Sequence, residues 1–445
     1  MRVEKPYKIS TKMMELKALK LTDEELFIVL CCRNAVKRSP TDALDILVNQ
    51  GLDWTFIEGI IRQQGIAGIV NSALAQSRYL HNTSDEVLKN LTLAVRQTAF
   101  KNLVYLREFS SLVKACNSEH IRIVPLKGIA FLTSLYKHNT TLRSLSDIDI
   151  LVEKKDVERV NTILLTMGYQ PKQTSDRDRQ RAFDAIYRRR VSGFTILIEV
   201  HWDIDYTDSS YAIDIAECWT RSHTVTADLG TYYELSCEDT LILNCFHILR
   251  YIPKGPEVLL HLKNFCDIAA LITQSNDDIN WECVIQRSRH YKVLRPVGLV
   301  LCLVRNLLGI TQVPSAIFEA LREESFQEVF AVCAVREYIF NTAYSEKKRL
   351  PFWMVDLATA SSVHEKIKIL KGAPNIFLSL YRARYFERYG RSTPKALIHI
   401  TWYYTRKAGA AIALWILAPR KTAQLQNKMT SVNRKTQEVI DWLQH

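Results

Sequence analysis

The stretch Arg143-Ser-Leu-Ser-Asp-Ile-Asp-Ile-Leu-Val152 places two acids inside an apolar segment that has the pattern of a short β-strand. On a strand, Asp147 and Asp149 point to one face, whereas Ile148 and Ile150 point to the other. An unpaired carboxylate is costly to bury, so these acids need a compensating charge. A divalent cation supplies one, because hard cations take oxygen ligands. We therefore expect a metal site on this strand.

Two more strand-like segments lie near it in the sequence. One is Ile121-Arg-Ile-Val-Pro-Leu-Lys-Gly128, and the other is Thr195-Ile-Leu-Ile-Glu-Val-His-Trp-Asp-Ile204. The second segment carries Glu199 among apolar residues, and we predict that this acid is the third metal ligand. We also expect the second segment to follow an earlier strand in a hairpin that turns at Ser192-Gly193. Together the segments predict a small mixed sheet.

Helical patterns precede and follow this sheet. Thr22-Asp-Glu-Glu25 has the pattern of a capping box at the start of a helix. A second helix is expected from about Asp53, and a long amphipathic helix is expected to end near Cys116. Shorter helices are predicted over Ile129–Tyr136 and Asp156–Met167.

The predicted fold class is therefore α+β, a small mixed sheet flanked by N- and C-terminal helical layers in a predominantly helical chain. We predict four regions. They are an N-terminal helical region (1–95), the sheet core (96–205), a helical domain (206–330) and a basic, aromatic-rich helical region (331–445).

A loose internal repeat connects the two helical layers. The segment Leu235–His247 aligns with Leu21–Arg33, and Ile279-Asn-Trp281 is similar to Leu52-Asp-Trp54. The distance between the two elements differs between the copies, so this is not a tandem array. Two similar helical layers explain the pattern, and so does a chance likeness between amphipathic helices.

The positive charge of the chain is concentrated at its C-terminal end. Residues 331–445 hold 19 Lys and Arg against 7 Asp and Glu, which accounts for the whole net charge of +12. The core is therefore neutral, which argues against a dedicated nucleic-acid channel there. The basic segment could contact an acidic partner, an anionic membrane surface or RNA. Within it, Ala408–Pro419 is too short to span a membrane and fits a core helix or an interfacial segment.

The ten cysteines favour a reducing compartment. None belongs to a C-x-x-C pair, so a structural zinc site has no support. The N-terminus lacks the apolar segment of a signal peptide. We expect a cytoplasmic protein without a transmembrane segment, with membrane-peripheral attachment left open.

The combination of Leu-Lys-Gly, Arg-x-x-x-Asp-x-Asp and Glu-Val-His-Trp resembles the nucleotidyltransferases of the DNA polymerase β superfamily. It looks like an uncharacterised bacterial branch, over roughly residues 20–315. The resemblance implies Mg²⁺-dependent transfer of a nucleoside monophosphate from a triphosphate such as ATP to a hydroxyl of a small molecule, a peptide natural product or a protein. Asp147 and Asp149 would bind two Mg²⁺ ions (or Mn²⁺), with Glu199 as the third catalytic carboxylate.

The resemblance also implies roles in nucleotide binding for four neighbouring residues. Gly128 would let the backbone approach the triphosphate. Lys127 stands where the superfamily has glycine in a Gly-Ser pair, and it either supplies positive charge or is solvated. Arg143 either holds a phosphate or forms a structural salt bridge. His201 shares the strand face of Glu199 and can reach the site, although such a histidine is more often structural.

Two other functions remain open from the sequence. A non-catalytic nucleotide-binding or scaffold protein would keep the fold without the reaction, but the three acids argue against it. Nucleotide addition to RNA would draw on the basic, aromatic C-terminal region.

Overall fold

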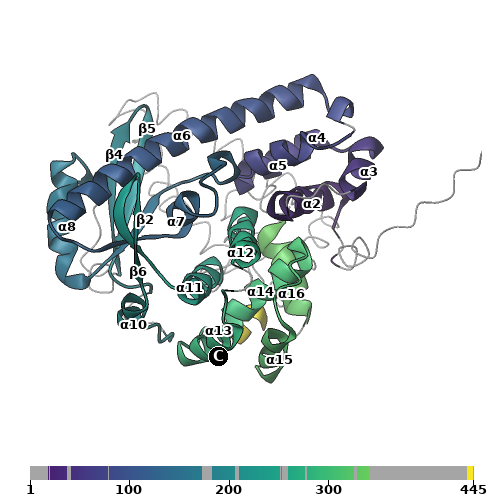
Figure 1. Ribbon diagram of the computed structural model, residues 1–445. Coiled ribbons are helices and arrows are strands. Elements are labelled where there is room, and N and C mark those ends of the chain that lie inside the picture. The colour runs from purple at the N-terminus through teal and green to yellow at the C-terminus, as the bar shows by residue number, and fades with distance from the viewer. Residues whose placement is uncertain are drawn as a thin grey trace, which may run out of the picture. The chain divides into compact units, whose positions relative to one another are not determined.

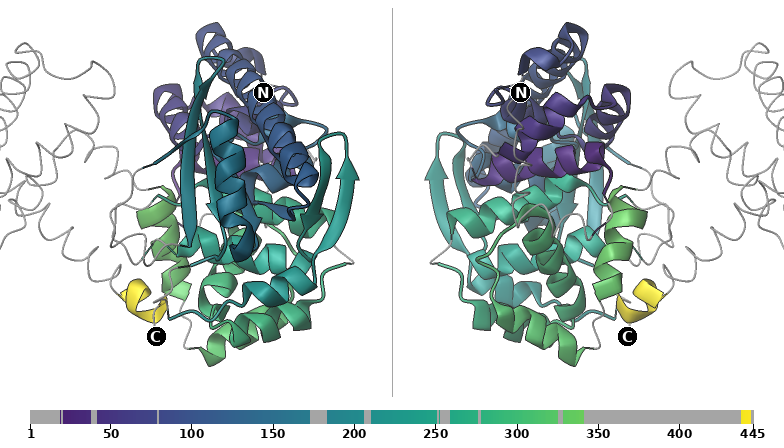
Figure 2. Two further views of the ribbon diagram at one scale, coloured as in Figure 1. Left: turned by 90° about the vertical axis from the view of Figure 1, so that its left-hand side faces the viewer. Right: turned by 90° about the vertical axis from the view of Figure 1, so that its right-hand side faces the viewer.

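The computed structural model describes residue 19 and residues 21–37, 42–78, 80–172, 183–205, 210–250, 252, 259–275, 278–324, 328–340 and 438–443. The chain divides into two compact units. Met1–Pro253, Leu260–Val332 and Trp442–His445 form the first, and Lys254–Leu259 and Cys333–Asp441 form the second. All the described strands, and the helices from α2 to α15, belong to the first unit (Figures 1 and 2).

Helices form the N-terminal part of the first unit. Their bounds are α2 Asp23–Lys37, α3 Asp42–Gln50, α4 Trp54–Gln64, α5 Ala67–Leu74 and α6 Asp85–Ser118, with a short 3₁₀ turn at Leu80–Asn82. The capping box predicted at α2 is confirmed, because the Glu25 amide donates to Thr22 Oγ1 (3.2 Å) and the Thr22 amide donates to Glu25 Oε2 (3.0 Å). Asp53 caps α4 in the same way, through the Phe56 amide.

A five-stranded mixed sheet follows α6, as predicted. Its strands are β1 Ile123–Leu126, β2 Ile148–Val152, β3 Gln170–Pro171, β4 Asp184–Val191 and β5 Phe194–His201, in the spatial order β1-β2-β5-β4-β3. Strands β2 and β5 are parallel, and the other neighbours are antiparallel. The connections contain α7 Lys127–Thr133, α8 Val157–Thr166 and 3₁₀ turns at Thr140–Leu142 and Lys154–Asp156.

Alternation along β2 and β5 separates a core face from a polar face. Ile148 and Ile150 of β2, with Ile198 of β5, are fully buried. Because side chains alternate along a strand, the acids of these strands lie on the opposite face. The predicted hairpin is confirmed: Ser192 and Gly193 have φ values of 50° and 84°, as a tight two-residue turn requires.

A second helical layer completes the first unit. Its elements are α10 Ile215–Thr220, the hairpin β6 His223–Ala227 and β7 Gly230–Glu234, α11 Cys237–Leu249, α12 Leu262–Gln274, α13 Trp281–His290, α14 Leu294–Leu308 and α15 Ser315–Glu323. Helix α16 Glu328–Cys333 and a π-helix, Ala334–Ile339, follow. This layer contacts the N-terminal one directly, because the Arg33 guanidinium donates to the carbonyls of Asn306 and Leu307 at the end of α14.

The hydrogen bonds of the two layers support the internal repeat. In the first copy, Glu24 accepts a hydrogen bond from the amide of Asp53, the residue that caps α4. In the second copy, Glu238 accepts one from the amide of Asn280, the residue that caps α13. Since Glu24 aligns with Glu238, both layers join their two helices by the same contact. Chance likeness of two amphipathic helices does not explain this agreement.

Several expectations have specific outcomes. A helix is present near the predicted range Ile129–Tyr136, but the predicted bounds are wrong by two to three residues, because α7 begins at Lys127 and ends at Thr133. All ten cysteines are free thiols. None of the helices in the described ranges is long and apolar enough to cross a bilayer. The basic region is described only at 331–340 and 438–443, so Ala408–Pro419 lies outside the described residues.

Two helical glycines give a matched test of how α5 supports the sheet. A Cβ on Gly68 would lie 1.9 Å from the carbonyl oxygen of Thr141, in the turn that leads to β2, whereas a Cβ on exposed Gly59 of α4 would meet nothing within 4 Å. Gly68→Ala should lower the free energy of unfolding by about 2 kcal/mol through overpacking. Gly59→Ala should raise it by about 0.5–1 kcal/mol. Urea unfolding measures both, and equal effects would contradict this packing.

Candidate active site

The strand register brings acids and bases to one edge of the sheet. Asp149 of β2 lies beside Glu199 of parallel β5, and Leu126 at the end of β1 lies on its other side. Lys127 follows Leu126 directly, so its side chain starts next to Asp149. His201 is two residues after Glu199 and therefore shares its face. Sequence patterns alone do not show which residues are neighbours across these strands.

These side chains contact one another. His201 Nε2 lies 2.9 Å from Asp149 Oδ1 and 3.7 Å from Glu199 Oε2. The Lys127 ammonium bonds to the same Asp149 oxygen and lies 3.9 Å from Glu199 Oε2. Asp149 and His201 are nearly inaccessible, whereas 21% of the Glu199 side chain is exposed. The cluster therefore has a buried floor and one accessible acid.

Burial and mutual repulsion distribute the protons within the cluster. Burial and the adjacent Asp149 carboxylate raise the pKa of Glu199 to about 8. Although burial opposes it, the Lys127 ammonium and His201 hold the pKa of Asp149 well below its usual range. Burial lowers the pKa of His201, so its imidazole is neutral at pH 7. At neutral pH the carboxyl group of Glu199 thus holds a proton, and Asp149 carries the negative charge.

Lys127 adopts an uncommon backbone conformation. Its φ is 53°, in the left-handed region that favours glycine. The nucleotidyltransferases that the sequence resembles have glycine at this position, as the first residue of a Gly-Ser pair. The turn therefore keeps a backbone conformation typical of glycine, although the residue is a lysine. Such strain costs about 1–2 kcal/mol and persists where surrounding contacts enforce it. Here the ion pair with Asp149 is the contact that holds the side chain in place.

Asp147 lies just before β2 and outside the tight group. The three ligand atoms of Asp149, Glu199 and His201 all lie within 4.8 Å of one another, and Asp147 is not among them. Its carboxylate accepts a hydrogen bond from Ser146 (2.9 Å) and is half-buried. Burial and the nearby Asp149 carboxylate raise its pKa.

Arg143 and Gly128 both have close contacts with other protein groups. Arg143 Nε donates to both carboxylate oxygens of Asp267 on α12, at 3.0 and 2.7 Å, which is the structural alternative left open by the sequence. A Cβ on Gly128 would lie 2.8 Å from Leu145 Cδ2 and 3.1 Å from Arg143 Nη2, so the missing side chain accommodates protein atoms. Their contacts with a nucleotide remain predictions.

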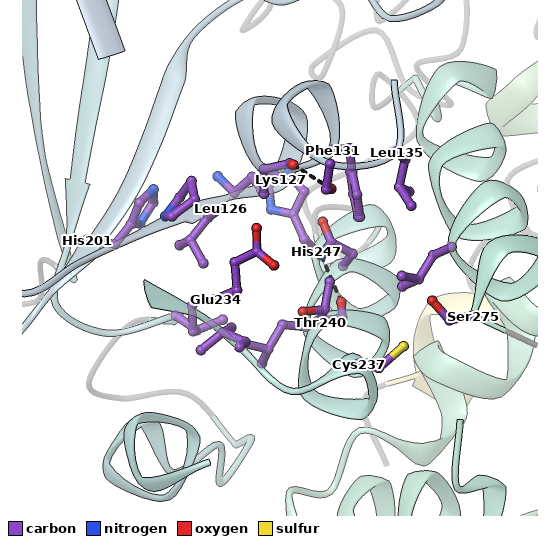
Figure 3. Close-up of a pocket in the computed structure, with 18 of the residues that line it drawn as sticks. Leu126, Lys127, Phe131, Leu135, His201, Glu234, Cys237, Thr240, His247 and Ser275 are labelled. Atoms are coloured by element: carbon purple, nitrogen blue, oxygen red, sulfur yellow. Dashed lines mark hydrogen bonds between the residues drawn. The ribbon is translucent and has the colours of Figure 1, made fainter. Parts of the chain in front are cut away.

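A pocket of about 410 Å³ opens beside Lys127 and His201 (Figure 3). Helices α7, α11 and α12 and strand β7 contribute to its walls. Its size is in the range of small-molecule sites, roughly 300–1,000 Å³. In the view of Figure 3, His201 lies at one side, with Cys237 and Ser275 at the other. Sequence patterns gave no reason to select its residues on α11, Thr240, Asn244 and His247, because they lie within a helix that is otherwise apolar.

The donor set fits a divalent cation. Two carboxylates offer the oxygen ligands that Mg²⁺ and Mn²⁺ prefer, and the imidazole adds a nitrogen. The ammonium of Lys127 already lies against these oxygens, so the cluster accommodates positive charge. The remaining nitrogen of His201, Nδ1, is buried without a hydrogen-bond partner among the described residues. The imidazole is therefore oriented by the contact of Nε2 with Asp149 and by the ring of Phe183, which stacks on it with the centroids 5.9 Å apart.

Comparisons with known proteins identify the family of this chain. One solved structure, an antigenic nucleotidyltransferase-like protein from Paracoccidioides brasiliensis, is similar at 15% identity and a TM-score of 0.28, over 48% of this chain and 96% of that one. A comparison with curated proteins gives no significant match. The profile of a family described as uncharacterised nucleotidyltransferases matches residues 50–309, more than half of the chain. The protein thus belongs to this nucleotidyltransferase family, as its Asp-Ile-Asp strand and its neighbours predicted.

Proposed function

We propose that the protein transfers a nucleoside monophosphate from a nucleoside triphosphate to a hydroxyl acceptor, with Mg²⁺ or Mn²⁺ held by Asp149, Glu199 and His201. The observation that carries the proposal is the convergence of these three side chains on neighbouring strands, beside the Lys127 ammonium. Membership in a nucleotidyltransferase family supports the reaction class. Asp147 extends the ligand set towards a second cation.

Each residue of the cluster has a separate role in this transfer. The acceptor oxygen forms a bond to the α-phosphorus, and the bond from that phosphorus to the leaving diphosphate breaks. The proton of Glu199 would be displaced by a bound cation, and the acceptor proton would then pass to this carboxylate, the more accessible acid of the tight group. Bound cations would neutralise the negative charge of the phosphate oxygens. Lys127 holds the triphosphate at the mouth of the pocket, and the pocket accepts the nucleoside.

Binding and turnover together test this proposal. Each of the four nucleoside triphosphates is titrated calorimetrically into the full-length protein, with Mg²⁺ and with excess chelator. We expect saturable binding of at least one nucleotide that requires the cation. Pyrophosphate release from the same nucleotide is then followed with candidate acceptors. Failure of all four nucleotides to bind in the presence of Mg²⁺ or Mn²⁺ would overturn the proposal.

Metal affinity is expected to increase as the pH rises to about 8. Below that pH, Glu199 carries a proton that a cation must displace, so the affinity for Mn²⁺ falls about tenfold per pH unit. Above it, the carboxylate is already ionised and the affinity levels off. Calorimetry in buffers of different ionisation enthalpy counts the released proton between pH 6 and 9. Glu199→Gln should bind Mn²⁺ more weakly and without this slope; an unchanged slope in that variant would assign the proton to another group.

A further inference from the structure

A second cavity, which we call the α2 cavity, lies among helices α2, α5 and α12. Its volume is about 280 Å³. Helix α2 packs against both α5 and α12, and the segment that follows α7 completes the walls (Figure 1). Among the described residues that line the α2 cavity, only Leu135 also lines the pocket of Figure 3. The α2 cavity is therefore a separate site rather than an extension of the candidate active site.

Asn34 of α2 is a buried amide that lacks a hydrogen-bond partner. It lines the α2 cavity, and only 1% of its surface is exposed. Neither its Nδ2 nor its Oδ1 has a hydrogen-bond partner among the described residues. An amide that loses its hydrogen bonds with water on burial is costly unless other hydrogen bonds replace them. The side chain therefore requires a partner from outside the described residues.

A second buried asparagine, Asn102 of α6, shows the usual arrangement. Its Nδ2 donates to the carbonyls of Thr140 (2.7 Å) and Arg143 (2.8 Å), and its oxygen accepts a hydrogen bond from a backbone amide. Packing does not require an amide at Asn34 either. In the second copy of the internal repeat the equivalent residue is Ile248, which is buried and apolar. The amide of Asn34 thus has no structural role that its contacts reveal.

The lining of the α2 cavity is uncharged and, apart from Asn34, its floor is apolar. None of the described residues that line it is Asp, Glu, Lys or Arg. Its other buried members are Ile69, Tyr136, Cys266 and Ala270. The hydroxyl of Tyr136 already bonds to Asp267. A single water molecule beside Asn34 would find few of the polar partners that a buried water needs.

We propose that the α2 cavity binds a neutral, planar ligand that presents a hydrogen-bond donor beside an acceptor, as a primary carboxamide or the amino edge of a nucleobase does. Asn34 Oδ1 accepts from the amine of the ligand, and Nδ2 donates to its carbonyl oxygen or ring nitrogen. Asparagine pairs with the edge of adenine in this way. The apolar floor packs against the faces of the ring. The volume lies just below the usual range for drug-sized ligands, roughly 300–1,000 Å³, and therefore suits a single ring system.

Saturation-transfer NMR on the full-length protein tests this proposal with two probes, benzamide for a carboxamide and 9-methyladenine for a nucleobase. We expect at least one of them to bind with a Kd of about 0.1–1 mM, as is usual for so small a ligand. The tighter probe identifies the source of the amide edge. Benzoate, which is charged, and acetophenone, which lacks the donor, should bind at least about tenfold more weakly than benzamide. The compound 6,9-dimethylpurine, in which a methyl group replaces the amine, is the equivalent control for 9-methyladenine.

Two substitutions in the α2 cavity and one matched control extend the test. Asn34→Leu should weaken probe binding at least about tenfold and leave Tm unchanged or higher, because it removes a buried amide that has no partner. Asn102→Leu removes an amide whose hydrogen bonds are made, so it should lower Tm by several degrees. Ser72→Leu, at a half-buried position of α5, fills the cavity while Asn34 stays in place, and it should abolish binding.

Each outcome either supports the inference or overturns it. Binding of neither probe, as expected if water alone fills the α2 cavity, overturns it. So does binding that Asn34→Leu and Ser72→Leu leave unchanged, or a Tm that falls as far in Asn34→Leu as in Asn102→Leu. Probe binding that is lost in Asn244→Leu, on α11, would assign the probe to the pocket of Figure 3 instead. Binding that is lost in Asn34→Leu and retained in Asn244→Leu supports the inference, whatever reaction the acidic cluster performs.

Discussion

Replacing Asp149 by asparagine is expected to lower the rate of pyrophosphate release at least about 1,000-fold, equivalent to roughly 4 kcal/mol of transition-state stabilisation. Asp149 is the member of the cluster that carries full negative charge at neutral pH, and it contacts both Lys127 and His201. Asparagine keeps its shape but not its charge. If the cluster holds a cation as proposed, it then loses one of the ligands, while its packing is preserved.

The same substitution has opposing effects on stability. The pKa of Asp149 is lowered in the folded state, so its ionised form stabilises the fold above the unfolded-state pKa, and this contribution is lost in asparagine. Removing the charge also relieves Glu199, whose pKa Asp149 raises. The substitution also leaves the Lys127 ammonium without the charge of Asp149, so we expect Tm to fall as well as the rate. Thermal unfolding of the variant distinguishes the catalytic from the structural effect.

Glu153→Gln is the matched control for this experiment. Glu153 immediately follows β2 at the opposite end from Asp147, and it pairs with Arg122 and Lys155 rather than with the cluster. Its loss should change the rate less than about twofold. Unchanged turnover in Asp149→Asn, or equal losses in both variants, would remove the cluster from the chemistry.

Replacing Asp267 by alanine should lower the free energy of unfolding by about 3–5 kcal/mol. Arg143 and Asp267 are both buried, with 7% and 3% of their side chains exposed, and they join the turn before β2 to helix α12. Burial raises the pKa of Asp267 even though Arg143 opposes this shift. The attraction between the two side chains therefore does not fully offset the cost of burying the carboxylate. Its removal is nevertheless costly, because Arg143 is left charged and buried without a carboxylate.

A double variant separates the cost of leaving Arg143 unpaired from the cost of losing hydrogen bonds. Arg143→Met with Asp267→Leu removes both charges and should recover about half of the lost stability. The remainder reflects hydrogen bonds such as that of Tyr136 to Asp267. Glu153→Ala, which breaks the more exposed pair with Arg122, should cost less than about 1 kcal/mol. Chemical denaturation compares the three variants. A double variant no more stable than Asp267→Ala would mean that the hydrogen bonds, not the unpaired charge, dominate.

Local patterns were sufficient to predict the sheet and the face of its acids. Alternation along Thr195–Trp202 identifies a strand, and the same period places Glu199 and His201 together. The capping residues Thr22 and Asp53 and the hairpin turn at Ser192-Gly193 are equally local, and the structure confirms them. Each of these features depends on residues only a few positions apart.

Contacts across long sequence separations could not be predicted in this way. The partner of Arg143 lies 124 residues away on α12, so the sequence left its role open between phosphate binding and a salt bridge. The contact of Lys127 with Asp149 depends on the register of two antiparallel strands.

The two copies of the internal repeat differ in what their equivalent side chains contact. Helices α2 and α11 keep the same cap and the same contact with the next helix. At aligned positions, however, Leu26 and Leu30 of α2 are buried apolar residues, whereas Thr240 and Asn244 of α11 line the pocket. Helix α2 therefore contributes to the core at these positions, whereas α11 presents polar side chains to the pocket. A duplicated helix pair in which one member is free to change offers a route by which related chains can alter the molecule they bind without rebuilding the sheet.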